Sequence, residues 1–214
     1  MLGGLKHEKT KGPPIGGICL VSNEHFPNTT AVFNRPGPLT QTIVIIMILD
    51  HIFAVTLIFA TFTTILVTGI VFTFALLVMP GTGKLADREF LRAFQEMDGI
   101  IQRSHPIFIT VWVGSNSALL ASVILAFGRL DGLPLALLLA STVVYYLGVQ
   151  LPTILGNIPL NNRLQKLNLE TMGPEPLASA RSQFERPWNR LNMLRTCVAL
   201  AVSVTLLTVV LLSR

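Results

Sequence analysis

Four long apolar segments, separated by polar connections, dominate the chain from residue 52 onward. They cover residues 52–79, 107–127, 133–151 and 194–212, and the first two contain no charged residue. The hydrocarbon core of a bilayer needs about 20 helical residues, so each segment is long enough to span a membrane. None has the short apolar stretch and cleavage pattern of a secretory signal. The pattern predicts an all-α fold, a bundle of four transmembrane helices.

The connection between the first two spans has a different pattern. From residue 85 to residue 101, apolar side chains recur at helical spacing and charged side chains fill the other face. The apolar positions are Phe90, Leu91, Phe94, Met97 and Ile101. This predicts an amphipathic interfacial helix on the end of the bundle, with Asp87 capping its start. Residues 129–132 form a short turn, which makes the second and third spans antiparallel neighbours.

The first 46 residues are rich in glycine, proline and polar residues and show no periodicity. Such composition predicts a disordered N-terminal extension, followed by a membrane domain over residues 47–214. Met47 stands just before the first span and is a plausible start of translation. We therefore expect residues 1–46 to be dispensable or misassigned, and expression from Met47 tests this.

Composition agrees with a membrane protein. The chain is 51% hydrophobic and only 13% charged, with a mean hydropathy of +0.62, whereas soluble domains carry about 25% charged residues. The net charge of +5 comes without a stripe of basic and exposed aromatic residues, so nucleic-acid binding is excluded. Two cysteines make no disulfide framework, and no nucleophile elbow, zinc motif or phosphate loop occurs.

Charge asymmetry predicts the orientation. The connections at 80–106 and 152–193 share one side of a four-span bundle and carry Lys84, Arg88, Arg92, Arg103, Arg163, Lys166, Arg181, Arg186 and Arg190, with Arg195 at the edge of the last span. Near the spans, the other side carries only Arg35, Arg129 and Arg214. The positive-inside rule places both long connections in the cytoplasm and both termini on the opposite side.

Polar side chains beside the spans come from three segments on the cytoplasmic side. They are Gln95, Asp98, Gln102 and His105; then Asn157, Asn161 and Asn162; then Trp188, Arg190, Asn192 and Arg195. Polar residues are costly in lipid and usually face the bundle interior. The segments therefore predict a polar pocket in which His105 or Asp98 exchanges a proton, arginine holds an oxygen-rich group, and amides orient it.

A purely structural interpretation remains open for each of these residues. Asparagines cap helix ends, Arg195 can bind carbonyl groups or anionic lipid, and Trp188 can anchor at the headgroups. Pro159 is expected to break the helix after the third span, with Asn157 and Asn161 pointing inward and Asn162 acting as a cap. Asn116 is the deepest polar residue that a ligand entering the bundle would meet. Glu96, Asp98 and His105 match no familiar ligand spacing, so no metal site is predicted.

Four stretches together resemble a known family. They are "GIVFTFALLVMPG" at the end of the first span, "FQEMDGIIQRSHPIF" entering the second, "NIPLNNRL" after the third, and "WNRLNMLRT" opening the fourth. In this order they resemble the anthrone oxygenase-like membrane proteins over roughly residues 52–212. The asparagine–proline stretch and the Trp–Arg–Asn–Arg stretch are the most specific pair.

The resemblance implies a small four-helix membrane bundle. It also implies oxidoreductase chemistry of the monooxygenase kind, in which members of the family oxidise anthrones with molecular oxygen and without a metal or flavin cofactor.

We expect His105, Asp98 and Arg195 to be catalytic. Substrate binding is expected from Gln102, Asn157, Asn161, Trp188, Arg190 and Asn192. The expected partners are membrane lipid and a hydrophobic aromatic or quinone-like small molecule, and a homo-oligomer is left open. The alternative function is non-enzymatic binding of lipid or a partner subunit through the same polar mouth.

Overall fold

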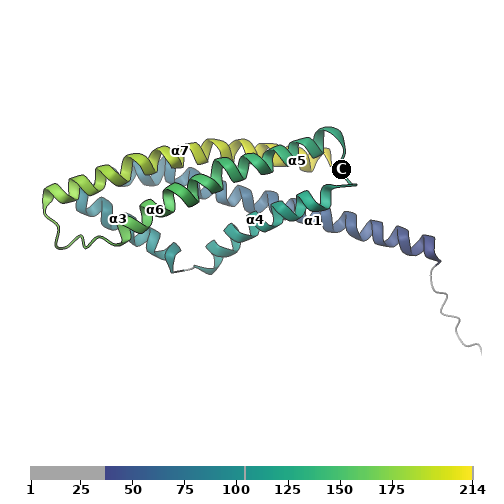
Figure 1. The fold of residues 1–214 in the computed structure, drawn as a ribbon, viewed down its shortest axis with the longest axis horizontal. Helices are drawn as coiled ribbons and strands as arrows, with labels where there is room; N and C mark the ends of the chain where they lie inside the picture. The colour runs from purple at the N-terminus through teal and green to yellow at the C-terminus, as the bar shows by residue number, and fades with distance from the viewer. Residues whose placement is uncertain (1–36, 104, 214) are drawn as a thin grey trace, which may run out of the picture. The chain divides into compact units, whose positions relative to one another are not determined.

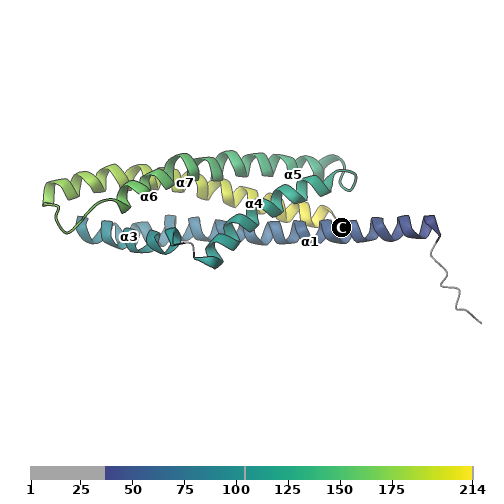
Figure 2. The same ribbon diagram turned by 60° about the horizontal axis from the view of Figure 1, so that its bottom comes forward.

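The computed structural model describes residues 37–103 and 105–213, and this part of the chain is a helical bundle without β-strands (Figures 1 and 2). Four helical segments in it are apolar and long enough to cross a membrane: Pro38–Thr82, Pro106–Ala126, Gly132–Gln165 and Pro174–Leu212. The second is α4 (Pro106–Ala126) and the fourth is α7 (Pro174–Leu212). The predicted all-α fold with four spans is confirmed.

The first and third spans are built from several helical pieces. The first combines α1 (Pro38–Thr73), η1 (Phe74–Val78) and α2 (Met79–Thr82). The third combines α5 (Gly132–Tyr145), η2 (Tyr146–Gln150), η3 (Thr153–Asn157) and α6 (Ile158–Gln165). The helix thus continues well beyond residue 151, and the prediction that Pro159 breaks it is wrong.

The three η segments are π-helical turns, and each ends two residues before a proline: Pro80, Pro152 or Pro159. Proline has no N–H to donate, and its ring collides with the carbonyl four residues earlier in an α-helix. A wider turn, with hydrogen bonds to the fifth residue back, relieves this collision without ending the helix. The prolines therefore widen the helices locally and do not end them. A prediction from sequence alone takes a proline at these positions as the end of the helix.

The first span starts earlier than predicted. It begins at Pro38, so residues 38–46 are helical and do not belong to an irregular extension. The prediction for residues 1–36 falls outside the described residues. At about 1.5 Å per residue, the 45 residues of the first span extend about 68 Å, more than twice the hydrocarbon core. Figures 1 and 2 show the start of α1 extending alone beyond the other helices.

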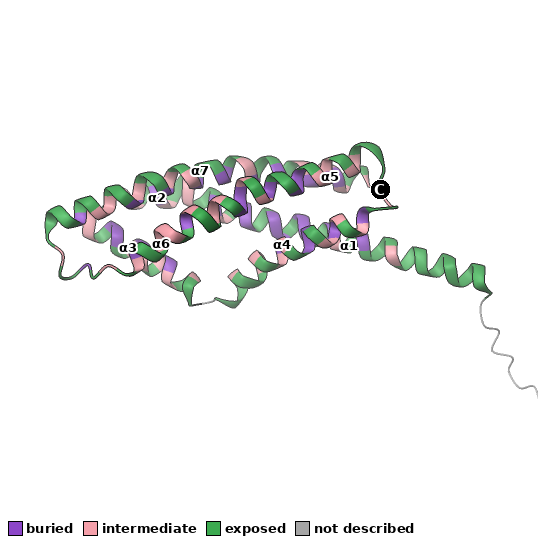
Figure 3. Cartoon of the chain, in the orientation of Figure 1, coloured by how far each residue is buried: buried purple, intermediate pink, exposed green. Residues whose placement is uncertain are grey.

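The core between the spans contains fully buried Leu57, Leu119, Leu138, Tyr145 and Leu206. Apolar side chains also cover the outer surface, where Figure 3 shows exposed positions along each span. An apolar exterior is what a lipid-facing bundle requires, since lipid tails are as apolar as the core.

A second apolar cluster closes one end of the bundle. It joins Phe90, Leu91 and Phe94 of α3 (Asp87–Gln102) to Phe184 and Trp188 of α7. The predicted amphipathic helix between the first two spans is present with its predicted apolar face. Asp87 does not cap it, because Ala86 holds the N-cap position and no side chain bonds there.

Arg181 of α7 instead holds the carboxylate of Asp87 at 3.0 Å. At the other end of the bundle, a short turn with Gly128 and Gly132 at positive φ joins α4 to α5. The antiparallel pairing of the second and third spans is confirmed, and Arg129 ties this turn to Asp50 of α1 at 3.2 Å.

Candidate functional site

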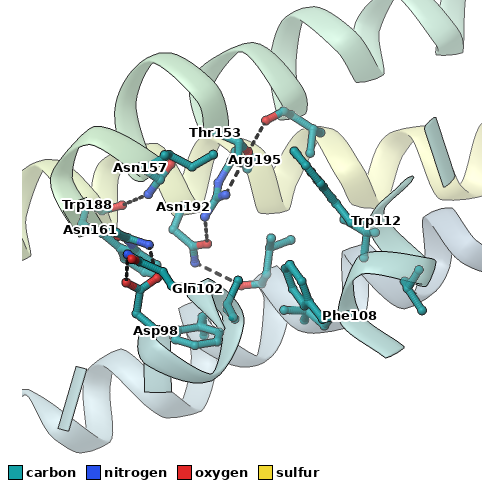
Figure 4. Close-up of a pocket in the computed structure, with 18 of the residues that line it drawn as sticks. Asp98, Gln102, Phe108, Trp112, Thr153, Asn157, Asn161, Trp188, Asn192 and Arg195 are labelled. Carbon is teal, nitrogen blue, oxygen red and sulfur yellow. Dashed lines mark hydrogen bonds between the residues drawn. The ribbon is translucent and has the colours of Figure 1, made fainter. Parts of the chain in front are cut away.

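A pocket of about 270 Å³ lies where α3, α4, the η3–α6 segment and α7 meet the end of α1 (Figure 4). Most of its wall is apolar, including five aromatic residues: Phe74, Phe94, Phe108, Trp112 and Trp188. Its polar lining consists of Asp98, Gln102, Thr153, Asn157, Asn161, Asn162, Asn192 and Arg195. Ligand pockets usually combine such an apolar wall with a few convergent polar groups.

The three polar segments identified in the sequence do converge here. Seven predicted site residues line the pocket: Asp98, Gln102, Asn157, Asn161, Trp188, Asn192 and Arg195. The other two, His105 and Arg190, are exposed and do not line it. His105 lies between α3 and α4, and Arg190 lies on a different face of α7 from Asn192 and Arg195.

Asp98 is buried and accepts three hydrogen bonds, all from side-chain amides. Asn161 Nδ2 donates to Oδ1 at 2.7 Å. Gln102 Nε2 and Gln165 Nε2 donate to Oδ2 at 2.7 and 2.9 Å. A carboxylate offers about four lone-pair positions, so Oδ1 retains one acceptor position.

Trp188 fixes the orientation of the Asn161 amide. Its indole Nε1 donates to Asn161 Oδ1 at 3.0 Å, so Asn161 Nδ2 is directed to Asp98. The indole ring itself packs against Phe94 and Phe74, at centroid distances of 5.2 and 5.6 Å. The carboxylate is thus positioned through a chain that ends in the aromatic cluster of the bundle end.

Arg195 is also buried, and neutral groups accept its hydrogen bonds. Nη1 donates to Thr153 Oγ1 at 2.9 Å and Nη2 to Asn192 Oδ1 at 2.8 Å. Its guanidinium carbon lies 5.8 Å from the centre of the Trp188 ring. Nε is buried and has no hydrogen-bond partner. Burial of a cation with only neutral partners is costly, which marks this position as more than a packing site.

Asn192 links Arg195 to the first span. Its Nδ2 donates to the backbone oxygen of Val71 at 3.0 Å, and Thr196 Oγ1 donates to the same oxygen at 3.2 Å. Both hydrogen-bonding ends of the Asn192 amide are therefore used, and the residue holds Arg195 in place.

The third span supplies a row of polar residues at intervals of four: Thr153, Asn157, Asn161 and Gln165. In an α-helix each such step overshoots a full turn by about 40°, so the row would wind away from the pocket. The wide π-helical turn from Thr153 to Asn157 reduces this drift. Three members line the pocket, and Gln165, outside the lining, donates to Asp98.

The asparagines of this span behave partly as predicted. Asn157 is buried on the pocket wall, with Oδ1 unpartnered and Nδ2 only 3.5 Å from the Trp188 oxygen. Asn161 faces the pocket as expected. Asn162 is not a cap: it lies within α6, lines the pocket and accepts from Gln102 at 3.2 Å.

Several pocket residues were missed by reasoning from the sequence. Thr153, Phe108 and Trp112 line the pocket, and Gln165 bonds Asp98. The four-residue spacing of Thr153 and Gln165 with Asn157 and Asn161 was the signal that could have found Thr153 and Gln165. Asn116 lies outside the lining and bonds the backbone of its own helix at Trp112. Among the described residues, no three His, Cys, Asp or Glu side chains group as a metal site.

The fold and the site define a four-helix membrane protein with a largely apolar pocket at one end of the bundle. The family model described as anthrone oxygenase matches residues 100–205, from the end of α3 into α7. The chain belongs to this anthrone oxygenase-like family. The match includes six of the pocket's predicted residues and begins two residues after Asp98. No curated protein and no solved structure matches the chain significantly.

Proposed function

We propose that the protein oxygenates a hydrophobic aromatic or quinone-like compound in this pocket, using molecular oxygen and no cofactor. The observation that carries the proposal is the pairing of a buried carboxylate and a buried guanidinium in one largely apolar pocket, with neither neutralising the other. A flat ring system fits walls made of phenylalanine and tryptophan rings, and the family match favours an anthrone-like substrate.

In this reaction the acidic CH₂ group of an anthrone first loses a proton to a base. The resulting carbanion has its charge delocalised onto the carbonyl oxygen of the anthrone. It transfers one electron to O₂, and the two radicals combine into a peroxide. Loss of water from the peroxide leaves a carbonyl. One oxygen atom of O₂ becomes the new carbonyl oxygen on the former CH₂ carbon, the other leaves as water with both hydrogens of the CH₂ group, and O₂ takes up four electrons.

Asp98 is the base in this proposal, because it lines the pocket and His105 does not. Its Oδ1 has an acceptor position left for the substrate proton, and its amide partners hold it in one orientation. Arg195 stabilises the oxyanion that forms as the proton leaves, since its guanidinium lines the pocket and is held in place by neutral partners only. Gln102, Asn157, Asn161 and Asn192 orient the ligand or these two charged groups.

Oxygen uptake by the purified protein with a panel of anthrones tests the proposal. Asp98→Asn and Arg195→Gln should each lower kcat by about a hundredfold or more, the usual loss when a base or an oxyanion donor is removed. Arg186→Gln is the matched control, because Arg186 lies on the same helix as Arg195 but is exposed and outside the pocket. Turnover unchanged in both pocket variants would remove these assignments. Absence of uptake with every anthrone would contradict the proposed reaction.

A further inference from the structure

Arg195 is a buried cation without an anion. The side chain is 7% exposed, and no carboxylate of the described residues forms an ion pair with it. Of its five N–H groups, one on Nη1 and one on Nη2 are used by Thr153 and Asn192. The remaining three include the Nε–H, which is buried and unpartnered. The protein therefore keeps a positive charge and free donors at the pocket wall.

Asp98 does not supply the missing charge. Its two oxygens are held by the amides of Asn161, Gln102 and Gln165, all of which are neutral. A buried charge is stable only when paired and hydrogen-bonded, so the unpaired guanidinium favours a ligand that brings its own negative charge.

We infer that the pocket binds a long-chain fatty acid, with the fatty-acid carboxylate on Arg195. The guanidinium is a planar fork whose geometry matches the two oxygens of a carboxylate. A single cation calls for a single negative charge on the ligand, and a fatty acid joins one carboxylate to a hydrocarbon chain that suits the largely apolar lining.

The pocket wall suits a hydrocarbon chain. Val67, Ile70 and Val149 are part of its apolar lining. Ile109 and Ile158 also line it, and each is 37% exposed, so apolar pocket wall passes directly into the apolar outer surface. A ligand dissolved in the membrane can therefore enter without crossing a polar barrier.

Asn157 can adapt to an anionic ligand. Its unpartnered Oδ1 would repel a carboxylate, but the terminal amide torsion has two nearly equivalent orientations. Turning the amide gives up the long 3.5 Å contact to the Trp188 oxygen, brings Oδ1 to that side in its place, and presents Nδ2 to the ligand. Asn157 and Arg195 both line the pocket, as this shared binding requires (Figure 4).

Both tryptophans of the chain, Trp112 and Trp188, line the pocket, so intrinsic fluorescence reports its occupancy. Dibromostearic acid is the probe, because bromine quenches tryptophan on contact, and its uncharged methyl ester is the control for partition into detergent. We expect saturable quenching by the acid at a concentration about ten- to a hundredfold lower than for the ester, the range of one charged hydrogen bond. Equal quenching by acid and ester would overturn the inference.

Variants assign the preference to Arg195. Arg195→Gln should abolish the difference between acid and ester, and Arg186→Gln should retain it. Circular dichroism verifies folding, and if Arg195→Gln does not fold, Arg195→Lys should show a reduced preference because lysine keeps the charge but lacks the fork. A full preference in folded Arg195→Gln, or in Arg195→Lys where that variant replaces it, would contradict the assignment.

Fatty-acid binding uses the pocket of the proposed oxygenase but not its chemistry. Acid-selective quenching without oxygen uptake would contradict only the oxygenase proposal. Turnover of an anthrone without acid-selective quenching would contradict only fatty-acid binding.

Discussion

Arg195 and Asp98 line one pocket and make no ion pair with each other. Thr153 and Asn192 hold the guanidinium, and three amides hold the carboxylate. A direct ion pair would neutralise both charges. Neutral partners fix the two side chains and leave both charges available to a ligand. This separation is the property on which both proposed uses of the pocket depend.

Trp188→Phe tests whether the tryptophan positions Asp98 through Asn161. Phenylalanine keeps most of the ring packing but loses the 3.0 Å bond to Asn161 Oδ1. We expect a loss of about 1 kcal/mol in the free energy of unfolding and about a fivefold lower kcat with little change in KM. Trp112→Phe changes the wall similarly, without removing a side-chain hydrogen bond, and should affect KM instead. A change in KM without a change in kcat for Trp188→Phe would contradict the positioning role.

Gly148→Ala tests how closely the third and fourth spans approach. A Cβ at Gly148 would lie 2.7 Å from Val198 Cγ1 and 3.1 Å from Cγ2. Valine is stiff at χ1 and cannot turn away, so the variant should lower the free energy of unfolding by about 1–3 kcal/mol. Val198→Ala in the same chain should restore part of the loss.

The control for this substitution is Gly69→Ala, because nothing lies within 4 Å of a Cβ there. Unfolding in increasing denaturant, followed by circular dichroism, compares the unchanged protein with Gly148→Ala, Gly69→Ala and the double variant. Equal stability of Gly148→Ala and Gly69→Ala would show that the spans are farther apart.

Arg181→Lys tests the clamp between α7 and the connection before α3. The guanidinium donates to the backbone oxygens of Gly83 and Leu85, bonds Asp87 and Glu185, and stacks over Phe90 at 4.5 Å. Lysine cannot serve these partners together, so the variant should be less stable by about 1–3 kcal/mol despite its retained charge. Faster proteolysis within residues 83–87 is the direct readout, and unchanged cleavage would argue against a clamp.

We also propose that both long connections face the cytoplasm, on the strength of their positive charge. In a chain with Cys19→Ser and Cys197→Ser, Asp131→Cys should react with an impermeant maleimide in intact cells. Lys84→Cys should react only after the membrane is permeabilised. Both positions are exposed in the bundle. The reverse labelling would invert the orientation.

The apolar runs were sufficient to predict the four spans, because length and hydropathy alone determine whether a helix can cross a bilayer. The end of the third span was mispredicted because Pro159 was taken as a helix breaker, whereas a π-helical turn accommodates it. The polar residues of the pocket could be found because amides and charges beside a span stand out from their surroundings.

The rest of the site could not be read from the sequence. His105 fits the helical stripe of Asp98 and Gln102, but α3 ends at Gln102 and the stripe ends with it. Trp112 and Phe108 carry no signal that separates a pocket wall from a lipid-facing surface. The unpaired state of Arg195 is visible only in three dimensions, because it depends on which neighbours are absent as well as on those present.

The π-helical turn η3 also determines where the chain can change in length. A one-residue deletion in α5 would rotate everything after it by about 100° and turn Asn161 and Gln165 away from Asp98. The same deletion within η3 can be absorbed by closing the wide turn to an α-helical one, which leaves the following residues facing as before. Proteins usually accommodate such changes in exposed connections. In this span, a segment that tolerates a deletion therefore lies in the wall of the pocket itself.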